Sequence, residues 1–543
     1  MVFARRSTTL LAAIIASCAM VLSLTACTSD NKTVVDGQTT VTSNSAGGVA
    51  VFTPSDGITL NQQTPLNKWA KLVPDLAKAL ADAGFKKGDI DHTTSDSLAK
   101  QSRAIQDFVV DHLSNNTTDD SGIAIAPDNM TLLVAPVVEA DASTRQYGDY
   151  ISQNLSTNDA TDEGATSDGE SSEDDSSKDD SSNTESDSTA SDEQAQAVDR
   201  LVSSLKLAKE SGMHVVLLGN SIEGYKPDAF VKFSDAQTIG KLQAEKMVSK
   251  LKLDKASKDN PKYIEVLLPY TAVDEKGNAN DSTFAQEAFR GIWQVLGSYY
   301  QKGVVESPSG TLDGKSTEND WQAVAYDAAK EGSTAKVLDK RLAKTDGQST
   351  LTRIDGIITM NDYIASEVVK ELDDLGYTGS AADINPQITI SGIVGNITGK
   401  KDLSRDAVPD PIKSPENDNA NDSSSSDDDA DEDTSASDKD RDSQWPLVTG
   451  YGAYVSNIPS IVNGKQWMTG MEDRQTIATD IAQACAKLNK DEALNSMPSI
   501  RNSEVGGGKK IPTISEPLLA VSASNLKSAL IDPGYISLAD AGL

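Results

Sequence analysis

Short apolar runs alternate along this chain with longer segments whose apolar residues recur at helical spacing. The runs predicted to be strands cover residues 49–52, 132–138, 215–218, 230–233, 263–268 and 354–359. Helical spacing is clear where Trp69, Leu72 and Leu76 share one face. Strands that alternate with helices build parallel sheets with helices on both faces. The pattern predicts an α/β fold of doubly wound parallel sheets, and 543 residues indicate two lobes, because single cores stop growing near about 250–300 residues.

The first 27 residues have the pattern of a targeting segment. Arg5 and Arg6 precede an apolar run of 13 residues, 10–22, which is too short to span a membrane. The run leads to Leu-Thr-Ala-Cys at 24–27, which resembles the lipobox of bacterial lipoproteins. We therefore expect a signal peptide over 1–26, lipid on Cys27, a tether over 27–48, and a place on the extracytoplasmic face of the cell membrane. The alternative is an ordinary secretion signal with a chance cysteine.

Acidic residues outnumber basic ones by 82 to 49, and two inserts hold much of this excess. Residues 157–193 contain 14 Asp and Glu against one Lys, and residues 415–443 contain 12 against two basic residues. Both inserts lack aliphatic side chains, so they cannot bury enough surface to offset chain entropy, and we predict them to be disordered. The net charge of −33 excludes nucleic acid as a partner, because nothing here replaces the phosphate counterions.

Enzyme chemistry has little support in the sequence. The three histidines, His92, His112 and His214, show no metal-ligand spacing. The run Gly-Gly-Gly-Lys at 506–509 lacks the Ser or Thr and the preceding strand of a phosphate loop. We expect no enzymatic activity, no cofactor and no metal. Cys485 lies in a four-residue apolar repeat at 477, 481 and 485, which predicts a buried, inert thiol on a helix.

Several stretches resemble a known family. Residues 354–362 are an apolar strand ending in Asn-Asp, and residues 448–453 and 461–469 read VTGYGA and IVNGKQWMT. They resemble the periplasmic-binding-protein type I family, specifically the xylose and multiple-sugar-binding lipoprotein components of ABC importers. The resemblance covers about 49–543 apart from the acidic inserts.

The resemblance implies two lobes joined by three crossovers, with a solute trapped in the cleft between them. The implied boundaries are 49–222 with 450–470 for the N-terminal lobe and 226–448 with 471–543 for the C-terminal lobe. The partners that it implies are a carbohydrate solute and an ABC permease. The membrane would be reached through the lipid anchor, and we expect a monomer.

The resemblance also carries a set of ligand-binding residues over to this chain. They are Lys68, Trp69, Asn280, Asn361, Asp362 and Tyr451. The Trp69 ring would stack on the apolar face of a sugar, and Lys68 would donate to its hydroxyls. Ordinary packing is the alternative for Trp69 and Tyr451.

Three positions depart from the family pattern. Asn220-Ser221 replaces an Asp-Arg pair, Gly452 stands where a ligand carboxylate is expected, and Glu472 replaces the usual lysine. A charged hydrogen bond contributes about 1.5–3 kcal/mol, so these changes either alter the solute or weaken its binding. Two functions remain open. One is a lipid-anchored solute receptor that delivers a neutral or larger sugar to a permease, and the other is a surface sensor or interaction protein that lost transport-type sugar binding.

Overall fold

The computed structural model describes eleven stretches of the chain. They are residues 34–35, 38–39, 46–55, 65–115, 125–138, 144–151, 153–156, 185–273, 279–343, 350–381 and 443–542. The chain divides into two units, Met1–Asn44 and Ser45–Leu543. The first contains only a short antiparallel pair in its described part, β1 (Val34–Val35) and β2 (Gln38–Thr39). Cys27 and the predicted signal peptide lie outside the described residues.

Seven strands form the larger sheet, in the order β17-β18-β9-β7-β5-β3-β4. In chain order they are β3 (Gly48–Pro54), β4 (Ile90–Ser95), β5 (Met130–Val134), β7 (His214–Leu218), β9 (Ala229–Val231), β17 (Ile500–Val505) and β18 (Lys509–Ile514). All neighbours pair in parallel except β17 and β18, which form an antiparallel hairpin. Strand β5 is buried along its whole length, as expected for a parallel sheet covered on both faces.

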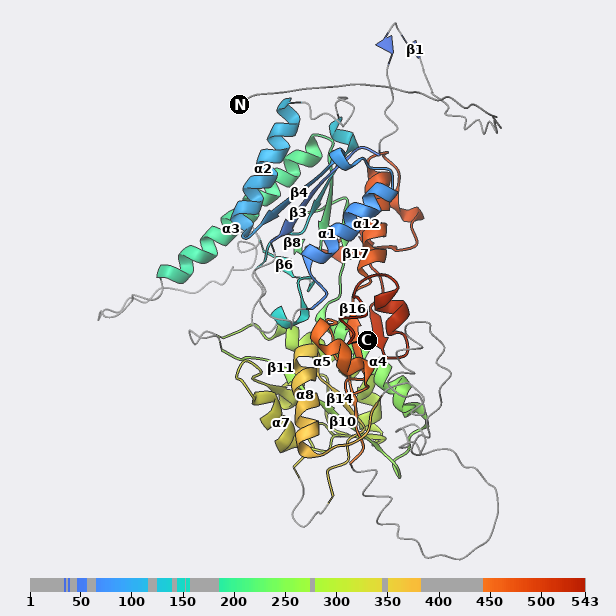
Figure 1. The fold of residues 1–543 in the computed structure, drawn as a ribbon. Coiled ribbons are helices and arrows are strands. Elements are labelled where there is room, and N and C mark those ends of the chain that lie inside the picture. The colour runs from blue at the N-terminus through green and yellow to red at the C-terminus, as the bar shows by residue number, and fades with distance from the viewer. Residues whose placement is uncertain are drawn as a thin grey trace, which may run out of the picture. The chain divides into compact units, whose positions relative to one another are not determined.

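Helices cover both faces of the seven-stranded sheet. They are α1 (Trp69–Asp82), α2 (Leu98–Asn115), α3 (Glu185–Glu210) and α12 (Arg474–Leu488). Successive residues of β3 point to opposite faces. Val49 and Val51 belong to a core with α1 and α12, whereas Ala50 and Phe52 belong to a core with α2 and α3. Figure 1 shows α1 beside α12 and α2 beside α3.

A second sheet has four parallel strands in the order β12-β10-β14-β15. Its strands are β10 (Lys262–Val266), β12 (Val305–Glu306), β14 (Gly356–Ile358) and β15 (Leu447–Val448). The helices of this part are α4 (Ala236–Leu251), α5 (Thr283–Gln301), α6 (Trp321–Val324), α7 (Ser333–Arg341) and α8 (Asp362–Leu375). One apolar core joins these helices to the four strands.

Short elements complete the fold. Two-stranded sheets pair β6 (Asn154–Leu155) with β8 (Ser221–Ile222), β11 (Leu268–Pro269) with β13 (Ala325–Tyr326), and β16 (Met468–Met471) with β19 (Leu519–Ser522). Short helices cover Lys87–Asp89, Pro127–Asn129, Arg145–Tyr147, Leu253–Lys255, Val455–Asn457, α11 (Ile458–Val462) and Leu494–Ser496, and a π-helix covers Lys527–Ile531. The chain passes from β9 to α4, returns from β15 through β16 to α12, and runs from β18 to β19.

The predicted α/β class with parallel sheets is confirmed. Every predicted strand overlaps an observed one, and Cys485 is fully buried on α12. Strand β4 was not predicted, because it is a sheet edge whose residues are mostly exposed and polar. The β17–β18 hairpin was missed as well, and its turn contains the three glycines 506–508, all with positive φ.

Two boundaries differ from the sequence prediction. Strands β9, β17 and β18 were assigned to the C-terminal lobe, but they pair into the same sheet as β7. The reason is that the chain crosses over after β9 rather than before it. Residues 185–193, predicted to be disordered, begin helix α3, because helix growth is cooperative once the following residues pack against α2. Residues 157–184 and 415–442 of the predicted inserts lie outside the described residues.

Candidate functional site

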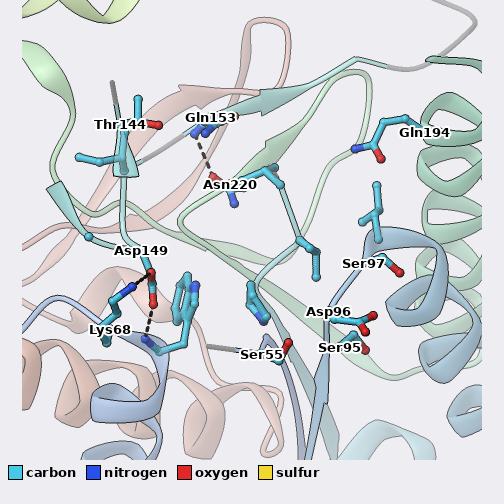
Figure 2. Close-up of a pocket in the computed structure, with 17 residues that line it drawn as sticks. Ser55, Lys68, Ser95, Asp96, Ser97, Thr144, Asp149, Gln153, Gln194 and Asn220 are labelled. Atoms are coloured by element: carbon cyan, nitrogen blue, oxygen red, sulfur yellow. Dashed lines mark hydrogen bonds and ion pairs between the residues drawn. The ribbon is translucent and has the colours of Figure 1, made fainter. Parts of the chain in front are cut away.

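A cavity of about 560 Å³ lies at the carboxyl ends of four neighbouring strands. Ser55 follows β3, Ser95 ends β4, Val137 follows β5, and Asn220 follows β7, and all four line it (Figure 2). Helices α1 and α2 both begin at its wall, at Trp69 and Leu98 respectively. Ligands of parallel α/β sheets bind beyond strand ends, so this is the position where a site is expected.

The cavity wall is rich in polar side chains. Those labelled in Figure 2 are Ser55, Lys68, Ser95, Asp96, Ser97, Thr144, Asp149, Gln153, Gln194 and Asn220. Hydroxyl groups both donate and accept hydrogen bonds, amides do the same through two different atoms, and carboxylates only accept. Such a mixture suits a ligand that carries several hydroxyls.

Lys68 and Trp69 line this cavity, but both are already held by the segment that follows β5. Lys68 Nζ donates to Asp149 Oδ1 over 2.7 Å, and the Trp69 amide donates to Asp149 Oδ2 over 3.1 Å. The Trp69 ring meets Tyr150 and Phe233 edge to face, at centroid distances of 5.1 and 5.7 Å. Only 3% of Trp69 is exposed, so its ring offers no open stacking face.

Asn220 and Asp96 show two different kinds of lining residue. Asn220 is buried, and its side chain accepts from the Gln153 amide at 2.9 Å and donates to the Pro136 carbonyl at 2.9 Å. It therefore shapes the wall. Asp96 is exposed and accepts from Lys100 Nζ at 2.6 Å, and this hydrogen bond lowers the pKa of the Asp96 carboxyl. Asp96 thus offers a charged acceptor at the mouth of the cavity.

A second cavity of about 510 Å³ adjoins the first. Thr144, Ile151 and Gln153 line both. The rest of its wall comes mainly from the starts of α4 and α5, including the carboxylates Asp235, Asp281 and Glu287 and the ring of Phe284. The two cavities therefore share part of one wall.

Asn280 lies next to the second cavity without lining it. Its side-chain amide donates to the Thr271 carbonyl at 2.8 Å, and its backbone amide donates to the Ala272 carbonyl at 3.0 Å. Its carbonyl accepts from the Tyr270 hydroxyl at 3.1 Å. Asn280 therefore closes a loop, and its neighbour Asp281 is the residue that faces the cavity.

Asn361, Asp362 and Tyr451 form one buried group that lines neither cavity. The Asn361 side chain caps α8 by accepting from the Ile364 amide at 2.9 Å. The Asp362 amide donates to the Tyr451 carbonyl at 2.9 Å. The sequence prediction placed these three in one site with Lys68, Trp69 and Asn280, whereas the structure groups them with each other and outside the cavity that Lys68 and Trp69 line. Their role in ligand binding stays a prediction.

The Asp362 carboxylate collects donors from the crossover that leads to β16. It accepts from the Tyr454 amide at 2.9 Å, from Gln466 Nε2 at 2.7 Å and from Thr469 Oγ1 at 2.9 Å. Burial raises its pKa to about 6, and these hydrogen bonds oppose the rise. A carboxylate with this many internal donors holds the crossover together.

Glu472 is a second buried carboxylate at a crossover, just after β16. It accepts from the Ser234 amide at 2.6 Å and from the Ser234 hydroxyl, and Ser234 Oγ also lies 2.6 Å from the Tyr451 hydroxyl. Burial raises the pKa of Glu472 to about 7 despite these hydrogen bonds. Ser234 belongs to the link between β9 and α4, and Glu472 follows β16. Their hydrogen bonds therefore fasten together two of the segments that connect the larger sheet with the four-stranded sheet.

Sequence reasoning missed several residues of the cavity wall. Asp96 and Ser97 follow β4, whose polar edge pattern concealed the strand and with it the strand end. Asp149 and Gln153 belong to an irregular stretch with no periodic signal. Gln194 follows directly after the insert predicted over 157–193 and precedes the first residue with recognised helical spacing. One sequence feature could have indicated this part of the wall. Asp96 and Lys100 are four residues apart where a helix begins, which is a spacing typical of an ion pair.

Within the described ranges, no three His, Cys, Asp or Glu side chains are grouped so that they could hold a metal ion. Of the helices formed by described residues, none is both long and apolar enough to cross a membrane.

Comparisons with known proteins found structural neighbours only. No protein-family model matches the chain, and no curated protein matches it significantly. An ABC transporter solute-binding protein from Clostridium phytofermentans with bound β-D-glucose is 17% identical, with 91% of this chain and 99% of that chain covered and a TM-score of 0.44. A carbohydrate transporter solute-binding protein from Chloroflexus aurantiacus in complex with D-glucose is 18% identical, with 92% and 98% covered and a TM-score of 0.43.

A periplasmic ribose ABC transporter from Conexibacter woesei is 14% identical, with 90% of this chain and 96% of that chain covered and a TM-score of 0.41. Because the identities and the TM-scores are both low, these likenesses establish neither family membership nor function for the chain.

Proposed function

We propose that this protein is an extracytoplasmic solute-binding protein that captures a carbohydrate and delivers it to an ABC permease. The observation that carries the proposal is the cavity of about 560 Å³ at the ends of β3, β4, β5 and β7. Its volume is in the range of small-molecule pockets, and its wall combines hydroxyl, amide and carboxylate groups with Trp69. The family resemblance of 354–362 and 461–469 supports the same function.

The chemistry of the wall favours a neutral solute. Asp96 and Asp149 are the lining carboxylates, and Lys68 is the one lysine among the lining residues. Lys68 is already paired with Asp149, and Asp96 is paired with Lys100, so a phosphorylated or carboxylated sugar would meet two lining carboxylates and no unpaired lining lysine. A neutral sugar avoids this repulsion and offers hydroxyl donors to Asp96.

A thermal-shift and calorimetry screen tests the proposal, with D-xylose, D-glucose, maltose and maltotriose as probes. A sugar that binds only the folded protein must raise the melting temperature. Asp96→Ala should weaken the binding of the responsive sugar by about tenfold or more, since a hydrogen bond to a charged group contributes about 1.5–3 kcal/mol. Asp107→Ala is the matched control, because Asp107 is exposed on α2, the helix that follows Asp96, and lies outside the cavity wall. Equal affinities of the two variants, or no sugar response, would count against the site.

A further inference from the structure

Residues 144–151, which we name the bridging segment, are anchored in two different apolar cores. Tyr147 is 1% exposed and belongs to the core of the four-stranded sheet, with its ring 4.7 Å from that of Phe284. Tyr150 is also 1% exposed, but it belongs to the core shared by α1 and α12, where it stacks on Phe233 at 4.7 Å. Two tyrosines three residues apart therefore join the two sheet systems.

Polar contacts fasten the bridging segment to the start of α1. The Asp149 amide donates to the Asn67 carbonyl at 2.8 Å, and the Asp149 carboxylate holds Lys68 Nζ and the Trp69 amide. The Tyr150 hydroxyl donates to the Lys68 carbonyl at 2.5 Å. The segment therefore already binds the Lys68 ammonium group and the Trp69 backbone amide, which lie at the wall of the first cavity.

Other polar contacts fasten it to the side of the four-stranded sheet. Asn361 Nδ2 donates to Gln146 Oε1 at 3.1 Å, and the Tyr454 hydroxyl donates to the Gln146 carbonyl at 2.6 Å. The Tyr147 ring lies 6.2 Å from that of Tyr451. On this side the bridging segment therefore contacts the Asn361 amide, the Tyr454 hydroxyl and the Tyr451 ring. Amides, hydroxyls and aromatic rings are the kinds of group that recognise sugars.

Both cavities border this segment. Thr144 and Ile151 of the segment line both of them, so its removal would join about 560 Å³ and about 510 Å³ into one groove. Its only regular structure is the single turn Arg145–Tyr147. Short segments with little regular structure open at a lower free energy than packed helices and strands.

We propose that the bridging segment is an internal occupant of the binding groove that competes with the solute, so that only a solute long enough to displace it, such as an oligosaccharide, binds tightly. Tyr147, Asp149 and Tyr150 then determine which solutes enter. This inference deepens the proposed function and rests on it for the identity of the competitor, but the placement of the segment is tested without any solute.

Gly148 provides the sharpest variant. Its φ is +97°, and a Cβ there would lie 2.5 Å from the Asn67 carbonyl oxygen, which is backbone and cannot move aside cheaply. Gly148→Ala should therefore unseat the segment. Gly310→Ala is the matched control, since Gly310 also has positive φ, at +70°, and nothing lies within 4 Å of its added Cβ. Both variants carry the backbone cost of a side chain at positive φ, and only the first carries the clash.

The sugar-free experiment measures trypsin cleavage after Arg145 in the full chain, read by mass spectrometry from fragments that begin at Gln146. We expect cleavage in Gly148→Ala to be about tenfold faster or more than in the parent and in Gly310→Ala, because cleavage follows the population of the open form. Circular dichroism melting checks that Gly148→Ala is folded. If it is not, Tyr147→Ala replaces it, with Tyr299→Ala on α5 as control. Equal cleavage rates in folded variant and control would overturn the proposal.

The solute experiment uses D-glucose and maltotriose. Maltotriose should bind Gly148→Ala about tenfold more tightly than the parent, because the cost of opening has been removed, whereas D-glucose should bind both alike. Bound maltotriose should also speed cleavage after Arg145 in the parent. Slower or unchanged cleavage with maltotriose bound would overturn the competition. If neither sugar binds any variant, the proposed function fails for these sugars, and the sugar-free cleavage rates alone decide whether the segment opens.

Discussion

Asp362 lies at the start of α8 and is fully buried with three donors directed at its carboxylate, from Tyr454, Gln466 and Thr469. Asp362→Ala leaves these donors without their acceptor, and one orphaned buried donor costs about 1–3 kcal/mol. We expect the free energy of unfolding, measured by urea titration, to fall by at least that amount. Asp374→Ala, at an exposed position of the same helix, is the control and should change it by less than about 0.5 kcal/mol. A stable Asp362→Ala protein would show that the crossover does not depend on this carboxylate.

Glu472 makes stability depend on pH in a direction opposite to that of most carboxylates. Its pKa is raised from 4.5 to about 7, so the folded state holds the proton more tightly than the unfolded state. The resulting stability is present below pH 4.5 and is lost as the pH rises through about 7, on the order of 3 kcal/mol. Glu472→Gln should therefore lose less unfolding free energy between pH 5 and pH 8 than the parent does. Glu504→Gln, at an exposed site, should keep the parental slope, and an identical slope in all three proteins would refute the assignment.

At the scale of elements, helices α4 and α5 pack closely against each other. A Cβ on Gly240 would lie 2.2 Å from the Ala288 carbonyl oxygen, and a Cβ on Gly291 would lie 2.0 Å from that of Gln237. The two glycines thus let the helix backbones touch, and larger side chains would push them apart. We predict that Gly240→Ala and Gly291→Ala each lower the free energy of unfolding by about 1–3 kcal/mol, measured by chemical denaturation.

Gly314→Ala serves as the control for this helix pair, because its added Cβ meets its nearest neighbour at 3.6 Å, an ordinary contact. Equal stability of the Gly240, Gly291 and Gly314 variants would mean that α4 and α5 can separate at no cost. Cys485 on α12 is fully buried, and this burial raises the pKa of its thiol. The burial confirms the predicted apolar face of the helix.

At the scale of the whole molecule, residues far apart in sequence belong to one packed unit. Asn489, just after α12, donates to the carbonyls of Ala46 and Gly48 at 3.0 and 3.1 Å and accepts from Thr131 at 2.6 Å. Strands from both ends of this unit, β3 and β18, lie in one sheet. Segments from both ends of the unit from Ser45 to Leu543 therefore complete the larger sheet.

The predicted anchor concerns the whole molecule as well. If Cys27 carries lipid, Cys27→Ser should move the protein from the membrane fraction to the soluble fraction of the cells that produce it. Cys485→Ser is the control, because Cys485 is buried and should not affect partition. Equal membrane partition of the Cys27→Ser variant and the parent would show that the cysteine is not the anchor.

Much of the fold could be predicted because a buried face produces a regular pattern of apolar residues along the chain. The strand at 49–52 and the helix with Trp69, Leu72 and Leu76 were recognised from apolar period alone, and β3 and α1 confirm them. Strand β4 shows no such apolar pattern, because an exposed edge strand needs no apolar face. Its carboxyl end places Asp96 at the cavity, so part of the site was lost with it.

The sequence alone determined the class of fold, most of the strand and helix segments and the buried helix face of Cys485. Only the tertiary structure decided that β9 and β18 join the larger sheet and that the bridging segment lies between Lys68 and Asn361. It also decided the raised pKa of Glu472, whose donor Ser234 lies 238 positions away. The physical reason is range: apolar periodicity is set by neighbours along the chain, whereas sheet order, cavity walls and desolvation depend on groups that only the folded chain brings together.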